Sequence, residues 1–315
     1  MRLPLIIASV ICSLLYSTAS HAVPSEKKVS SRKLGLNIQV KGGGWGKVSN
    51  DSIETVLYSV ADELMSQLSV TPAVPIVVTH TEHNPITLFE RGEHGEYLVH
   101  LHAREANWHL YVYEFAHELC HILSNYNGNA GREGGRYNQW FEETLCETAS
   151  LYTLQSLATR WEKAPPAPEL AAQAERLHRF FELLINERHR QLPANAPLAV
   201  WLDDNEELLR HDPYQRQKNE VVANLLLPLF ATDPENWAML SYLNRDPADA
   251  RSNLRDYLHH WYLNAPPEHR TFIADILAMF WLRGVMPPGP SPATAQQLAT
   301  AEPVPHPPGK PSPGH

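Results

Sequence analysis

The feature that most constrains this chain is an amphipathic segment that carries two histidines. Between about Asn107 and Ser124, large apolar residues recur every three or four positions, at Trp108, Tyr111, Val112, Phe115, Leu119, Ile122 and Leu123. This period predicts one helix with a buried face. His117 and His121 stand four residues apart in this segment, so their imidazoles project from the same side of the helix.

The five residues from His117 to His121 form the pattern HExxH, which is typical of catalytic zinc sites. Two imidazoles on one helix face can bind the same ion. Glu118 lies about 100° round the helix, where its carboxylate reaches zinc-bound water without becoming a ligand. The chain has 17 histidines, and the alternative to a zinc site is a helix with two exposed or core histidines. A catalytic zinc site differs from this alternative because it requires a third protein ligand and leaves one coordination position open for water.

An acidic segment on the next predicted helix, from about Asn138 to Ala158, supplies candidates for that ligand. It reads Trp140-Phe141-Glu142-Glu143-Thr144-Leu145-Cys146-Glu147. Together with the HExxH pattern, this segment resembles the gluzincin metallopeptidases, which include thermolysin-like enzymes and zinc aminopeptidases. The resemblance implies one Zn²⁺ ion held by His117, His121 and Glu143.

The same resemblance implies that Glu147, one turn after Glu143, orients the first histidine through its second ring nitrogen. The chain departs from the family in a longer loop before Glu143 and in two neighbouring residues. Glu142 stands where many members carry asparagine, and Thr144 where many carry glycine. Glu142 is therefore an alternative ligand, although it lacks the one-turn relation to Glu147.

Other zinc classes fit the sequence less well. A metzincin needs glycine at position 124 and histidine at position 127, where this chain has Ser124 and Asn127. A structural zinc site calls for closely spaced cysteine pairs, and the chain has only three cysteines. Cys120 and Cys146 each follow an expected ligand by three residues; they predict either a disulfide or two reduced core residues.

Hydrolysis of a peptide bond requires a general base and a donor to the oxyanion as well as the metal. Glu118 is the expected base. In zinc aminopeptidases a tyrosine at the start of a later helix is the oxyanion donor. Tyr214 follows Glu143 by about the same number of residues as that tyrosine follows the glutamate ligand in those enzymes. His211 is the alternative, by its similarity to the histidine of thermolysin-like enzymes, and both can also be ordinary surface residues.

The chain opens with the features of a cleavable export signal. Arg2 precedes an uncharged apolar run from Leu3 to Tyr16, and small residues flank His21, which predicts cleavage after Ala22. No later segment is long and apolar enough to span a membrane. We therefore expect a secreted or periplasmic protein without a membrane span.

Four regions follow from the pattern along the chain. We expect a signal peptide at 1–22 and a zincin-like lobe at 23–160 with a mixed β-sheet and the active-site helix. An all-helical lobe at 161–285 and a disordered Pro-rich tail at 286–315 follow. The fold class is thus α+β. Expected strands lie at 33–40, 75–80, 85–90 and 96–103. The resemblance to the gluzincins implies that the last of these is the edge strand, which binds substrate backbone in such enzymes.

Together these features predict an exported zinc-dependent peptidase acting on a peptide or protein. The 26 basic and 35 acidic residues give a net charge of −9, which argues against a nucleic-acid partner. Two alternatives stay open: a catalytically inactive zinc-bound binding or assembly protein, and a zinc hydrolase that acts on a non-peptide amide. The sequence leaves open the side-chain preference, the choice between exo- and endopeptidase activity, and the oligomeric state.

Overall fold

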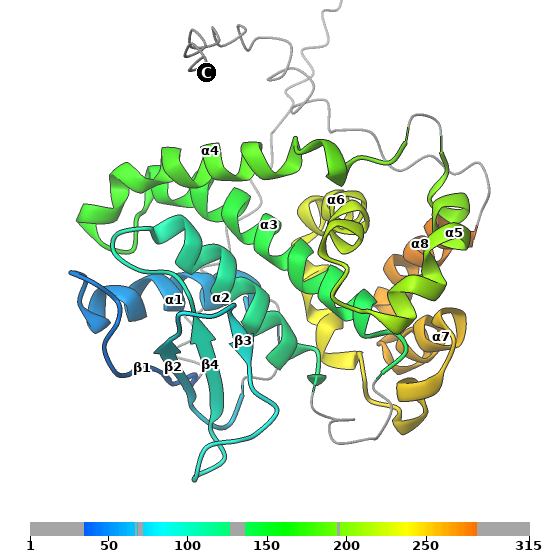
Figure 1. The fold of residues 1–315 in the computed structure, drawn as a ribbon, viewed down its shortest axis with the longest axis horizontal. Helices are drawn as coiled ribbons and strands as arrows, with labels where there is room; N and C mark the ends of the chain where they lie inside the picture. Colours follow the sequence, from blue (N-terminus) through cyan, green and yellow to red (C-terminus); the bar gives the residue numbers. More distant parts are fainter. Residues whose placement is uncertain (1–34, 67, 69–71, 127–135, 194–195, 282–315) are drawn as a thin grey trace, which may run out of the picture.

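The computed structural model describes residues 35–66, 68, 72–126, 136–193 and 196–281. The predicted signal peptide, the predicted tail and most of the loop between the two expected metal-binding helices lie outside these residues. The described chain is α+β, as the sequence predicted (Figure 1). Its first half contains β1 (Ile38–Val40), α1 (Asn50–Leu64), β2 (Ile76–His80), β3 (Ile86–Thr87), β4 (Tyr97–Leu101), α2 (Trp108–Leu123) and α3 (Gln139–Lys163).

The four strands form one mixed sheet in the order β1-β2-β4-β3. β2 pairs in parallel with β1 and with β4, and β3 pairs antiparallel with β4, with Thr87 opposite Val99. The expectation that 96–103 forms the edge strand was wrong, because β4 lies inside the sheet and β3 is at the edge. The reason is the tight hairpin before β4, where Gly95 adopts φ 84°. This turn places β3 against the side of β4 that β2 leaves open.

Two helices cover the sheet and continue its core. α1 begins where Ser49 caps it, since the Ser49 side chain accepts a hydrogen bond from the Ser52 amide. It packs against β1 and α2, while α2 packs against β3 and β4. The strands present Ile76, Val78, Val99 and Leu101 fully buried to this core. α2 occupies almost the full range that its apolar period predicted.

α3 runs through the middle of the molecule (Figure 1). It packs against α1 and α2 on one side and against α4 and α6 of the second half on the other. α3 is longer than the predicted 138–158, because Trp161 extends its buried face and donates a hydrogen bond from Nε1 to Ser59 Oγ of α1 at 3.0 Å. Arg160 and Lys163 stand in its last turn, where basic residues favour a helix end.

The second half of the described chain is helical, in agreement with the sequence prediction. Its α-helices are α4 (Ala174–Ile185), α5 (Leu198–His211), α6 (Arg216–Thr232), α7 (Leu254–Asn264) and α8 (Arg270–Trp281). Short 3₁₀ segments connect them: η2 (Pro168–Gln173), η3 (Arg188–Arg190), η4 (Pro234–Tyr242), η5 (Pro247–Arg251) and η6 (Pro267–His269). Among the described helices, none has the length and apolar character needed to cross a membrane.

Candidate metal centre

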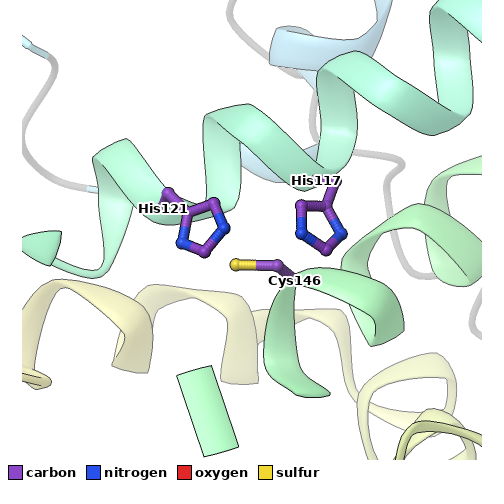
Figure 2. Close-up of side chains that lie close together, drawn as sticks. All are labelled: His117, His121 and Cys146. Carbon is purple, nitrogen blue, oxygen red and sulfur yellow. The ribbon is translucent and has the colours of Figure 1, made fainter. Parts of the chain in front are cut away.

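The two histidines of α2 face α3. Their imidazole rings lie 5.1 Å apart between centroids, and Figure 2 shows both projecting from one side of α2. His117 retains 23% of its side-chain exposure and His121 13%. The pair is thus sheltered by the protein on most sides and still accessible from solvent.

Glu143 of α3 brings one carboxylate oxygen to both rings. Its Oε2 lies 3.2 Å from Nε2 of His117 and 3.6 Å from Nε2 of His121. The three side chains that the sequence singled out as ligands therefore meet at one point between two neighbouring helices. Two imidazole nitrogens and a carboxylate oxygen are the donor set of many catalytic zinc sites.

The electrostatics of the cluster favour a positive charge at this point. Burial alone would lower the pKa of His121, but the carboxylates of Glu143 and Glu142 outweigh it and raise that pKa well above its usual value. Burial likewise opposes ionisation of Glu143, yet His121 and His117 hold its pKa below the usual range. Burial also opposes ionisation of Glu142, but Arg136 and His121 lower its pKa. The carboxylates of Glu142 and Glu143 thus both stay ionised and stabilise a cation beside them.

Glu142, the alternative ligand from the sequence, instead contacts the far side of His121. Its Oε1 lies 2.9 Å from Nδ1 of His121, and its Oε2 accepts hydrogen bonds from Arg136 at 2.7 Å and Asn244 at 2.9 Å. The Glu142 side chain is fully buried. Because the Glu142 carboxylate is bonded to Nδ1 of His121, the imidazole ring is held with Nε2 towards Glu143. Carboxylates outside the ligand set orient histidines in this way in many metal sites.

Glu147 does not make the contact with the first histidine that the resemblance implied. Its Oε2 accepts a hydrogen bond from the Tyr113 hydroxyl at 2.5 Å, and its Oε1 accepts one from Arg190 at 2.7 Å. Arg190 has no exposed side-chain surface and requires an anion beside it. Of the two glutamates that flank Glu143 here, Glu142 and Glu147, it is thus Glu142 whose carboxylate contacts Nδ1 of a candidate metal ligand, His121.

A second group of possible metal ligands lies farther along this network. Ligand atoms of Glu187, His189 and Glu220 approach within 4.8 Å of one another. Arg190 donates to both carboxylates, at 3.0 Å and 2.9 Å, and Arg216 donates to Glu220 at 2.8 Å. Two guanidinium groups already balance these acids, so we interpret this group as an ion-pair network.

Cys146 lies closer to the histidines than the sequence suggested. Its sulfur and one ring nitrogen from each of His117 and His121 lie within 4.8 Å of one another, and Figure 2 shows the thiol beside the two rings.

Cys120 and Cys146 are buried free thiols, so the alternative of two reduced core residues describes them and the disulfide is not formed. Burial and a hydrogen bond with Cys120 raise the pKa of Cys146 well above its usual value. Its position three residues after Glu143 is the signal that places it on the same helix face.

Glu118, the expected base, is buried beside His117. Its Oε2 accepts a hydrogen bond from the Thr87 hydroxyl at 2.7 Å. Thr87 belongs to β3, the edge strand. No sequence pattern singled out Thr87, because its proximity to Glu118 depends on how the hairpin packs against α2.

Tyr214 and His211 differ in their relation to this cluster. The phenol oxygen of Tyr214 accepts a hydrogen bond from Gln139, the first residue of α3, at 2.8 Å. Partial burial and the negative charge of Glu143 raise the pKa of Tyr214. His211 instead contacts its own helix, with Nδ1 2.8 Å from the Glu207 carbonyl oxygen. Of the two, Tyr214 is the one whose contacts point to the metal centre.

A cavity of about 570 Å³ lies along the first half of α2. Pro85 stands in its wall two residues before Thr87, Tyr113 one turn before His117, and Arg216 two residues after Tyr214. Leu110 and Phe180 add apolar surface. Residues that line the cavity thus stand close in sequence to three of the candidate site residues, Thr87, His117 and Tyr214.

No family model matches the chain, and searches of curated proteins and of solved structures found no match. The function is therefore inferred from the chain's own residues.

Glu142→Gln tests whether the buried carboxylate supports the metal centre. The substitution weakens the acceptor on Nδ1 of His121, so we expect zinc affinity to fall by about 10–100-fold. Competition with a chromophoric zinc chelator measures this affinity at a temperature where circular dichroism shows the variant folded. Glu147→Gln is the matched control, since Glu147 is also buried against an arginine but contacts neither histidine. Equal affinities of the two variants would contradict the role of Glu142.

Proposed function

We propose that this protein is an exported zinc-dependent peptidase. The observation that supports the proposal best is the approach of one Glu143 oxygen to Nε2 of both His117 and His121, at 3.2 Å and 3.6 Å. A set of two imidazoles and one carboxylate leaves a tetrahedral ion one position for water, as catalytic zinc requires. The donor types, their convergence and the carboxylate on Nδ1 of His121 all fit a zinc ion.

The metal and the residues around this point have different roles in amide hydrolysis. Zinc, when bound, lowers the pKa of a water molecule and polarises the scissile carbonyl. Glu118 takes a proton from the attacking water and passes it to the leaving amine. Glu118, next to His117 in sequence, is buried, so its carboxylate is kept out of bulk water.

Tyr214 is the proposed donor to the oxyanion. Gln139 donates to the phenol oxygen, so the phenol hydrogen stays free to donate to a negatively charged oxygen of the substrate. Tyr214 precedes α6, whereas the metal-binding residues belong to α2 and α3. The proposed active site thus draws on both halves of the chain.

The cavity along α2 has the size and lining of a substrate-binding site. Its volume of about 570 Å³ falls in the usual range for ligand pockets. Leu110, Phe180 and Leu184 offer apolar surface to a substrate side chain, while His102 and Arg216 offer polar groups. We assign this cavity to the peptide on one side of the scissile bond.

The fold and the leader sequence are part of the same proposal. A mixed sheet with an antiparallel edge strand, followed by two helices that carry the ligands, agrees with a zincin-like lobe. The proposed export rests on the apolar run and small residues before position 23, which indicate a secreted or periplasmic location.

Glu118→Gln separates metal binding from catalysis. We expect the variant to bind zinc as the wild type does and to lose about 10²–10⁴-fold in turnover of a peptide library, since a carboxamide cannot accept the proton. Mass-spectrometric mapping of cleavage products measures turnover, and elemental analysis measures zinc. Glu63→Gln, at a buried glutamate of α1 outside the lining of the cavity, is the matched control and keeps its turnover. Wild-type turnover in Glu118→Gln would exclude this residue as the base.

Tyr214→Phe tests the oxyanion donor. Removal of one such donor lowers kcat by about 10²–10³-fold, and we expect no change in thermal stability because Tyr214 as a residue is 65% exposed. His211→Gln, three residues earlier, should retain wild-type kcat. The reverse result, with only the His211 variant impaired, would transfer the role to the histidine.

A further inference from the structure

The carboxylate of Glu118 is held from one side by a residue of the sheet edge. Thr87 Oγ1 lies 2.7 Å from Glu118 Oε2 and 3.2 Å from the Glu118 backbone oxygen. A hydroxyl has one hydrogen to donate. The shorter distance and the negative charge favour the bond to the carboxylate, because charge-assisted hydrogen bonds are the stronger ones.

Thr87 itself is firmly placed. Its backbone pairs with Val99 in the antiparallel ladder between β3 and β4, and its side chain is buried. A threonine has few χ1 rotamers because it is branched at Cβ. The next residue of the chain is also anchored, since the Leu88 carbonyl accepts a hydrogen bond from Tyr126, which follows α2. The hydroxyl therefore approaches Glu118 from a rigid element.

This contact leaves the two carboxylate oxygens in different environments. Among the described residues, the hydrogen bonds of the Glu118 carboxylate all go to Oε2. Oε1 accepts no hydrogen bond from these residues, which leaves this oxygen available to accept a proton from the attacking water. A hydrogen bond to Oε2 fixes the rotation of the carboxylate, and such fixed geometry contributes strongly to the rate of proton transfer.

We propose that Thr87 is a positioning residue that orients the general base Glu118 through its hydroxyl. This proposal rests on the proposed peptidase function. Thr87 is absent from the lining of the cavity along α2, and its side-chain contact with the proposed machinery is the one with Glu118. The edge strand thereby has a role in the chemical step that does not depend on its backbone.

The test compares Thr87→Val with Thr87→Ser. Valine keeps the shape and removes the hydroxyl, so we expect kcat to fall by about 10–100-fold with KM nearly unchanged. Serine retains the hydroxyl and recovers most of the lost turnover. Thr153→Val is the matched control, because Thr153 is equally buried but its hydroxyl has no hydrogen-bond partner among the described residues. This control retains wild-type kcat.

The following results would overturn the proposal. Wild-type kcat in Thr87→Val shows that the hydroxyl is dispensable. A serine variant as slow as the valine variant, or a lowered melting temperature or zinc content in Thr87→Val, assigns Thr87 a purely structural role. If the zinc-loaded wild type cleaves no peptide of the library, the proposed peptidase function is wrong and the role of Thr87 falls with it. If the wild type is active and Thr87→Val is unaffected, only the role of Thr87 is contradicted.

Discussion

The site depends on the packing of α2 against α3. This contact is what brings an oxygen of Glu143 within 3.2 Å of one imidazole nitrogen and 3.6 Å of the other. Buried side chains join the two helices: Ser150 of α3 donates to the Tyr113 carbonyl oxygen at 2.8 Å, Tyr113 donates to Glu147, and Cys120 lies beside Cys146. Close packing of this kind leaves little room for the helices to shift. The spacing of the proposed ligands is therefore a property of the core.

Two buried carboxylates of α3 stand one residue before and four residues after Glu143. Glu142 contacts Nδ1 of His121 and is paired with Arg136. Glu147 is paired with Arg190 and accepts a hydrogen bond from Tyr113 of α2. Burying a charge is costly unless it is paired and hydrogen-bonded, and here each carboxylate accepts at least two bonds. Removing either arginine would leave an uncompensated charge next to the proposed metal centre.

The sequence was sufficient for the parts that depend on local periodicity. α2 and the start of α3 follow from apolar spacing, as does the shared face of His117 and His121, whereas the approach of Glu143 to both was expected from the family resemblance. It was insufficient for contacts between distant segments. Thr87 meets Glu118 across 31 residues through the packing of a hairpin, and the same hairpin moved the sheet edge from the expected strand to β3. The partners of Glu147 come from α2 and from η3, which no spacing rule on α3 can reveal.

X-ray absorption at the zinc edge of the zinc-loaded protein tests the central claim most directly. With His117, His121 and Glu143 as ligands, the first shell contains two imidazole nitrogens and oxygen at about 2.0–2.2 Å and no sulfur. The nearby thiol of Cys146 makes the alternative easy to recognise, since a thiolate scatters at about 2.3 Å. A sulfur shell, or fewer than two imidazoles, would contradict the proposed centre.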